Sequence, residues 1–84
     1  MREKAVDKEV EKFAAKWFVP FEDVKYEVYH YKDGQIANEN ILKSKADFAA
    51  YKEVNAGAMK FEFYDNLIED FHNNLMPEIM PLID

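Results

Sequence analysis

The most regular hydrophobic pattern in the chain lies in residues 59–83. Apolar residues recur there every three or four positions, which places them on one side of an α-helix. The stripe consists of Tyr64, Leu67, Ile68, Phe71 and Leu75, and one-turn steps extend it to Ile79 and Leu82. We expect this helix, beginning near Ala58, to be the element against which the rest of the chain packs. It should bend near Pro77, because proline disrupts helical hydrogen bonding one turn earlier.

A second helical pattern covers residues 3–18. Its apolar side chains follow the helical repeat, and the charged residues lie away from that side. The apolar positions are Val6, Val10, Phe13, Ala14 and Trp17. Pro20 follows, and a proline disfavours helical geometry in the residue before it. The helix is therefore expected to end before Pro20.

Residues 21–33 fit two patterns. Val24, Tyr26, Val28 and His30 alternate as in a strand, and Asp33-Gly34 is typical of a hairpin turn. The same segment also carries a helical stripe, formed by Phe21, Val24, Val28 and Tyr31. Residues 35–42 contain few strand-forming residues that could pair with it. We therefore predict a helix and keep the strand as the alternative.

The remaining residues predict short elements. Residues 35–46 form a polar connector with a turn of helix at 39–42, and Asp47 is a suitable N-cap for a helix through Val54. Together these patterns predict an all-α fold, in which residues 1–84 form a single helical domain. We expect a small bundle of about four helices with a long C-terminal helix. The predicted core consists of Trp17, Phe48, Tyr51, Tyr64, Leu67, Ile68 and Phe71.

The net charge of −6 is concentrated at the C-terminal end. No basic residue follows Lys60, whereas six acidic residues do. An acidic helix face suits a basic protein surface, or it simply keeps the helix soluble. The candidate partner contacts on this face are Glu62, Asp65, Glu69 and Asp70. The charged start of the chain lacks the apolar core of a signal peptide, and no apolar run could span a bilayer, so we expect a cytoplasmic protein without membrane contact.

The sequence provides little for catalysis. Gly34 and Gly57 are isolated and do not begin a phosphate-binding loop, and Ser44, the only serine, has no nucleophile motif around it. We predict no catalytic, cofactor-binding or metal-binding residue. Cysteine is absent, which excludes disulfides and thiolate metal sites.

Two Glu-x-x-His pairs, Glu27/His30 and Glu69/His72, have the spacing that holds metal in di-iron helical bundles. Metal ligands in such bundles must point into the core, whereas Glu69 lies almost opposite the apolar stripe of its own helix. The helix at residues 3–18 also offers no inward-facing glutamate. We interpret both pairs as surface pairs.

A loose group of lysines offers an alternative function. Lys43, Lys45, Lys52 and Lys60 lie near Phe48 and Tyr51 in the sequence. Lysines with nearby aromatic rings are typical of single-stranded nucleic acid binding. The aromatic residues suit the core better, so nucleic-acid contact through these lysines is the second hypothesis.

Three stretches of the chain carry a family resemblance. They are FAAKWFV at residues 13–19, ADFAAYKEVN at 46–55 and MKFEFYDNLIEDFHNNLMPEIMPLI at 59–83. In order and spacing they resemble the C-terminal region of type I restriction enzyme R subunits, over roughly residues 12–83. The similar positions are Trp17-Phe18, the segment 46–52, and Ile79 to Leu82. Residues 55–58 depart from the family, whose members often have an Asn-Pro turn there.

The resemblance implies that the chain is a fragment of a much larger subunit. Such a subunit uses ATP and Mg²⁺ to translocate and cleave DNA, but no residue of this chain matches the motifs for those steps. What the family assigns to this end is a non-catalytic helical module. Its implied partners are the methyltransferase and specificity subunits of the restriction complex, with DNA contacted through the parent complex.

Overall fold

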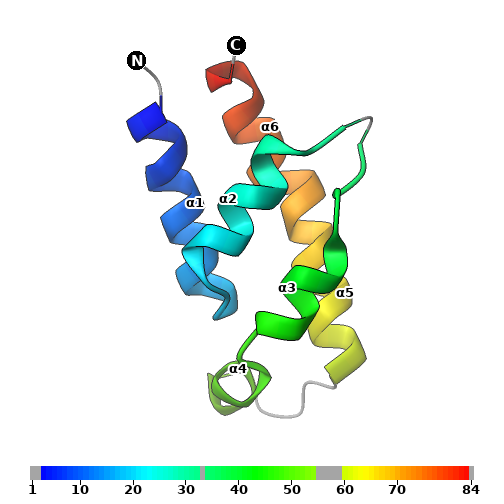
Figure 1. The fold of residues 1–84 in the computed structure, drawn as a ribbon. Coiled ribbons are helices and arrows are strands. Elements are labelled where there is room, and N and C mark those ends of the chain that lie inside the picture. The colour runs from blue at the N-terminus through cyan, green and yellow to red at the C-terminus, as the bar shows by residue number, and fades with distance from the viewer. Residues whose placement is uncertain (1–2, 33, 55–59, 84) are drawn as a thin grey trace.

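The computed structural model of the chain describes residues 3–32, 34–54 and 60–83, and these form an all-α bundle (Figure 1). The N-terminal half contains α1 (Glu3–Trp17), α2 (Phe21–Tyr29), α3 (Glu39–Lys45) and α4 (Phe48–Val54). The C-terminal part is continuously helical and consists of α5 (Lys60–Asp70), the π-helical segment η1 (Phe71–Leu75), α6 (Met76–Ile79) and the 3₁₀ segment η2 (Met80–Leu82). The predicted fold class is confirmed.

The C-terminal helical segments and α1 lie side by side and run in opposite directions (Figure 1). Helix α1 packs against η1, α6 and η2, and it also contacts α2. Helices α3 and α4 lie at the end of the molecule opposite to the start of α1 and to η2, near the start of α5 (Figure 1). Ion pairs reinforce the α1–α2 contact, because Lys25 Nζ lies 3.4 Å from Asp7 Oδ1 and 3.7 Å from Glu3 Oε1.

The core is built mainly from α1 and the C-terminal segments. All five apolar positions predicted for the first helix are buried. In the C-terminal segments the buried side chains are Phe63, Leu67, Phe71, Leu75, Met76 and Ile79. The predicted core was partly wrong: Phe48, Tyr51, Tyr64 and Ile68 are only partly buried, whereas Phe63, which the stripe omitted, has no exposed surface. The buried side of α5 is centred one position earlier than the predicted stripe.

Residues 21–33 contain a helix followed by a turn. Helix α2 covers Phe21–Tyr29, so the helix prediction is confirmed there and the strand alternative is wrong. The helix ends earlier than predicted, with His30 as its C-cap. Lys32 and Gln35 then exchange backbone hydrogen bonds of 3.2 and 2.9 Å, with Gly34 at a φ of 76°. The hairpin-turn pattern was therefore a local turn signal between two helices.

A backbone hydrogen bond joins the end of α1 to the start of α4. Phe18 follows α1 with a φ of 57°, the left-handed conformation that commonly ends helices, and Val19 N–H donates to the Ala14 carbonyl at 3.1 Å. The Phe18 carbonyl accepts a 2.7 Å bond from Asp47 N–H. Asp47 Oδ1 in turn accepts from Ala50 N–H at 3.1 Å, which confirms the predicted N-cap of α4.

The irregularity predicted near Pro77 is a change in hydrogen-bond spacing. Pro77 has no N–H to offer to the Asn73 carbonyl, so the α-helical pattern cannot be completed there. The turn before it is π-helical instead, and Met76 N–H donates to the Phe71 carbonyl, five positions back. Pro81 lies in η2, where the helix tightens to 3₁₀ geometry.

Candidate functional site

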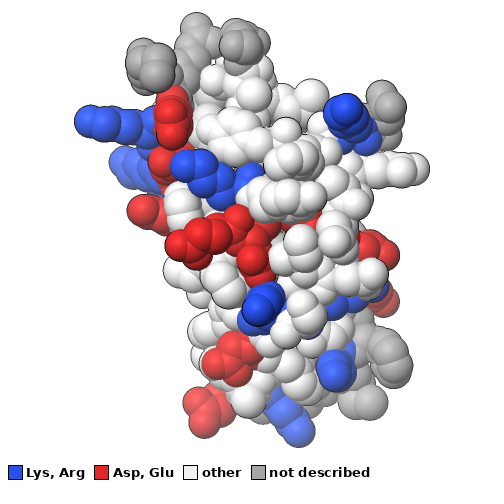
Figure 2. Space-filling model, viewed as in Figure 1, with Lys and Arg blue, Asp and Glu red and all other residues white. Residues whose placement is uncertain are grey.

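Exposed apolar side chains of α2 and η2 lie on a face formed by α2, α6 and η2, whereas the most exposed one, Val54, lies on α4. Tyr26 is 41% exposed, Tyr29 43% and Met80 55%. A small groove of about 150 Å³ lies between these elements, and it is lined by Val28, Tyr29, Tyr31, Met76, Met80 and Ile83. Figure 2 shows an uncharged area over the C-terminal half of α2 and over α6, with acidic side chains below it and basic side chains at its left and right edges. We call this area the α2–α6 face.

The α2–α6 face was not predicted from the sequence. The helix stripe of residues 21–33 accounts for Val28, which is buried, but leaves Tyr26 and Tyr29 on the outer side of α2. Tyrosines on the polar side of the predicted helix were therefore the sequence feature that could have indicated this face. Met80 gave no such signal, because its exposure depends on where η2 lies relative to α2.

The candidate partner residues of the C-terminal helix fall into two groups. Glu62, Asp65 and Glu69 are exposed on α5. Asp70 instead lies between α5 and α1, where its carboxylate accepts hydrogen bonds within the molecule. The donors are Trp17 Nε1 at 2.6 Å and Lys16 Nζ at 3.0 Å to Oδ2, and Asn74 Nδ2 at 2.6 Å to Oδ1.

These contacts determine the ionisation of Asp70. Partial burial alone would raise the pKa of this carboxyl group, but the hydrogen bonds from Trp17, Asn74 and Lys16 outweigh it and leave the pKa below its ordinary value. Asp70 therefore joins α1 to α5 as a partly buried carboxylate, and the exposed acidic surface consists of the other three residues.

The lysine group is spread over three elements. Lys43 and Lys45 lie on α3, Lys52 on α4 and Lys60 on α5. Lys43 Nζ lies 3.6 Å from Glu39 Oε1, and Lys60 Nζ lies 5.8 Å from the centre of the Tyr64 ring.

The aromatic rings near these lysines pack inside the molecule. Tyr51 stacks on Trp17 with ring centres 5.5 Å apart, and Phe48 meets Phe63 edge-on at 5.4 Å. They thus contribute to the contact between α1, α4 and α5, with both rings partly buried.

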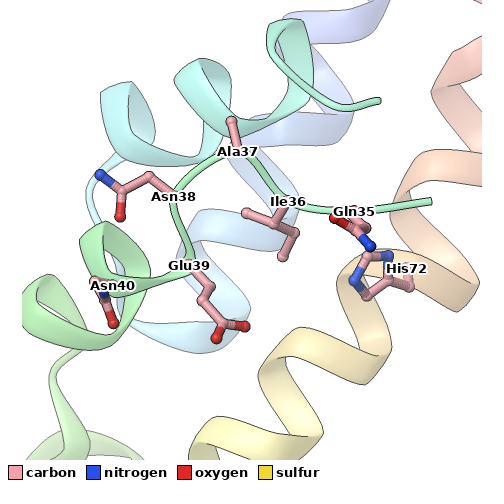
Figure 3. A pocket seen from close by; sticks show the side chains of 7 residues that line it. All are labelled: Gln35, Ile36, Ala37, Asn38, Glu39, Asn40 and His72. Atoms are coloured by element: carbon pink, nitrogen blue, oxygen red, sulfur yellow. The ribbon is translucent and has the colours of Figure 1, made fainter. Parts of the chain in front are cut away.

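A polar hollow of about 380 Å³ lies beside the connector between α2 and α3 (Figure 3). Residues 35–40 form one side of it, and His72 closes the other from η1. His72 Nδ1 is 3.2 Å from Tyr31 Oη, which ties the imidazole ring to the end of α2. Gln35 and His72 both line the hollow, Gln35 from the connector and His72 from η1 (Figure 3).

The two Glu-x-x-His pairs lie in different surroundings. Glu69 is exposed and His72 half-buried, and His30 stacks on Tyr26 at 4.1 Å on the surface. Glu27, however, has no exposed surface, so its interpretation as a surface residue was wrong. The structure buries it because the connector folds over α2 and donates the Asn38 N–H to Glu27 Oε1 at 2.9 Å. Among the described residues, no three acidic, histidine or cysteine side chains lie close enough together to hold a metal ion.

Comparisons with known proteins do not assign the chain to a family. No family model matches the chain, and neither the curated proteins nor the solved structures contain a match. Within the described part of the chain, no helix has both the length and the apolar character needed to cross a membrane.

Proposed function

We propose that this chain is a non-catalytic helical assembly module. In particular, we propose that it forms the C-terminal part of a type I restriction enzyme R subunit and docks on the methyltransferase core in the cytoplasm. The observation that carries the proposal is the α2–α6 face, where Tyr29 and Met80 remain exposed beside an apolar groove. Tyrosine and methionine are enriched at protein interfaces, and charged residues are depleted from interface centres.

The packing of the sequence motifs supports the same proposal. The motifs behind the family resemblance contain Trp17, Asp47 and Tyr51. Trp17 stacks on Tyr51, and the Asp47 N–H donates a hydrogen bond to the Phe18 carbonyl. These contacts join α1 to α4. Packing between helices therefore accounts for the presence of these motif residues, as is expected of a module with a structural role.

The decisive experiment removes the exposed side chains of the α2–α6 face. The variant Tyr29→Ala/Met80→Ala is compared with wild type for binding to the purified methyltransferase and specificity subunits, by isothermal titration calorimetry. We expect binding to weaken at least about tenfold, because large side chains at interface centres carry most of the binding energy. Val54→Ala is the matched control, since Val54 is 74% exposed on α4, away from this face.

Circular dichroism first establishes that each variant is folded. If the double variant binds the subunits as tightly as wild type and Val54→Ala do, docking through the α2–α6 face is excluded. If wild type itself does not bind them, the proposed membership of a restriction complex is excluded.

The second candidate is nucleic-acid contact through Lys43, Lys45, Lys52 and Lys60. The supporting observation is that Lys45, Lys52 and Lys60 are exposed on adjoining elements at one end of the molecule (Figure 1). Charge reversal in Lys43→Glu/Lys45→Glu separates the candidates. Nucleic-acid contact predicts weaker DNA binding and a smaller salt dependence, whereas the assembly module predicts unchanged binding to the methyltransferase core.

A further inference from the structure

Glu27 is a buried acid whose contacts the proposed function does not use. Its side chain lies between α2 and the part of the connector formed by residues 34–38, and it has no exposed surface. Oε1 accepts the Asn38 N–H at 2.9 Å, but Oε2 has no hydrogen-bond partner among the described residues. A buried carboxylate oxygen without a partner is costly, and the cost falls when the group is protonated or reaches water.

The surroundings favour the neutral form of this acid. Burial raises the pKa of Glu27, the Asn38 and Ala37 N–H groups and His30 oppose that rise, and Asp23 adds to it, so the pKa lies above its ordinary value. Asp23 and His30, both from the α2 segment, are the charged side chains that act on it among the described residues. The connector contributes only backbone N–H groups.

The same connector forms one side of the polar hollow. Tyr31 and Ile36 pack against the hydrophobic core, and the Asn38 N–H donates to Glu27, so the Glu27 contact holds the part of the connector next to α3. Gln35 to Asn38 line the hollow opposite His72 (Figure 3). If the Glu27 contact opens, the hollow loses this side.

We propose that Glu27 is a proton-controlled latch: the closed connector excludes water from its carboxyl group, so ionisation favours an open state in which the carboxylate is hydrated, against the opposing hydrogen bond from the Asn38 N–H. In the closed state the connector contacts α2 and shields the Glu27 carboxyl group from water. In the open state this contact is broken and the carboxyl group is hydrated. The closed state therefore binds the proton more tightly, and a rise in pH favours the open state. The polar hollow is complete while Glu27 is protonated and opens increasingly as Glu27 ionises.

Hydrogen exchange of the Asn38 amide measures the latch directly. Its protection factor, corrected for the intrinsic exchange rate, is followed by NMR between pH 4 and 8, while carbon-13 NMR follows the Glu27 carboxyl group. We expect protection of Asn38 to fall as Glu27 ionises, by up to roughly tenfold per pH unit within that range. Amides of α5, such as that of Leu67, should not follow this change.

Two carboxylate-to-amide variants complete the test. Glu27→Gln retains the oxygen that accepts the Asn38 N–H but cannot ionise, so protection of Asn38 should become independent of Glu27 titration. Asp47→Asn is the matched control, because Asp47 also accepts a backbone N–H but is exposed. It should behave as wild type.

The possible results separate the latch from a static contact. Constant protection of Asn38 in wild type, or a fall with pH that Glu27→Gln shares, overturns the latch. If Glu27→Gln does not fold, the wild-type data decide: matching midpoints for Glu27 ionisation and Asn38 protection support the latch, and different midpoints overturn it.

Discussion

Asp70 and Glu27 are both carboxyl groups withdrawn from solvent, but their neighbours shift their ionisation in opposite directions. Asp70 receives side-chain hydrogen bonds from Trp17, Lys16 and Asn74, and its pKa is lowered despite partial burial. Glu27 accepts the Asn38 N–H at Oε1, its Oε2 has no hydrogen-bond partner among the described residues, and burial raises its pKa. The number and charge of the donors therefore decide whether a buried acid stabilises the fold at neutral pH.

Removal of the Asp70 carboxylate should destabilise the bundle and change its response to acid. Because the folded-state pKa lies below the unfolded value, the stabilisation is present above the unfolded pKa and is lost as pH falls through the folded one. We expect Asp70→Ala to lower the free energy of unfolding at pH 7 by about 1.5–3 kcal/mol. Urea denaturation followed by the fluorescence of Trp17, the only tryptophan, measures this change.

Asp65→Ala is the control for Asp70→Ala, since Asp65 is an exposed aspartate of the same helix. Its loss should change stability by less than about 0.5 kcal/mol. Between pH 5 and 2, wild type should lose more stability than Asp70→Ala does. Equal losses would mean that the carboxylate of Asp70 does not contribute to acid sensitivity.

The left-handed backbone of Phe18 predicts an unusual preference for glycine. A side chain at a φ of 57° is strained, whereas glycine adopts this conformation freely. We expect Phe18→Gly to be more stable than Phe18→Ala by about 1 kcal/mol, measured by urea denaturation. At Ala15, a helical and exposed position of α1, the same comparison should have the opposite sign. An alanine advantage at both positions would contradict the inferred strain.

Among the elements, the π-helical segment η1 explains how the C-terminal helix keeps one side buried. Residues four apart in an α-helix drift by about 40° per step, since each residue turns about 100°. Phe63, Leu67 and Phe71 make such steps, and continued drift would turn the next residues out of the core. The wider turn of η1 contains one extra residue, so Leu75 and Ile79 are buried as well.

A single-residue deletion tests this role of η1. Deletion of Asn73, an exposed residue of η1, should convert the wide turn to an α-helical one and leave the later residues facing the core. Deletion of Asn66, exposed in the α-helical part, should instead rotate everything after it by about 100°. We expect cooperative thermal unfolding, measured by circular dichroism, to survive the first deletion and to be lost in the second.

A chain without Asn73 that unfolds no more cooperatively than the chain without Asn66 would contradict this role of η1. Both deletions remove the same residue type from an exposed position of one continuous helix, so the local hydrogen-bond pattern is the relevant difference.

The same helix illustrates what the sequence could predict. Periodicity located the helices, because apolar spacing and proline positions act over one or two turns. It missed Phe63, because a straight helical projection cannot include the effect of η1. It also missed Glu27, since acids are normally exposed. The Trp17–Asp70 bond joins residues 53 apart, and only the tertiary packing brings them together.

Over the whole molecule, an aromatic cluster joins helices that are far apart in the sequence. Phe63 lies 4.4 Å from Tyr51 and 5.8 Å from Trp17, measured between ring centres, and so connects α5 to α4 and α1. No residue of α4 is fully buried, so the attachment of this helix depends on the partly buried rings of Phe48 and Tyr51. A chain of this size has a total stability of only about 4–12 kcal/mol.

Phe63 should therefore be more critical than its neighbours in the cluster. Loss of a fully buried phenylalanine costs about 3–5 kcal/mol, a large part of the total. We expect Phe63→Ala to lose about 3–5 kcal/mol of unfolding free energy and therefore to unfold at a much lower urea concentration than wild type. Tyr51→Ala should remain folded but lose hydrogen-exchange protection in α4.

The control for these truncations is Tyr26→Ala, because Tyr26 is exposed and lies outside the cluster. It should shift stability by less than about 0.5 kcal/mol. A Phe63→Ala protein as stable as Tyr26→Ala would show that the ring of Phe63 is not central to the fold.

Helix α1 starts at Glu3 and η2 ends at Leu82, and these two elements pack against each other at the same end of the molecule (Figure 1). Linkers that connect a host protein to the start of α1 and to the end of η2 would therefore attach close to each other. Domains with adjoining ends are the ones that can be inserted into a host protein without forcing its own segments apart. The bundle is thus suited to insertion into a surface loop of a host protein.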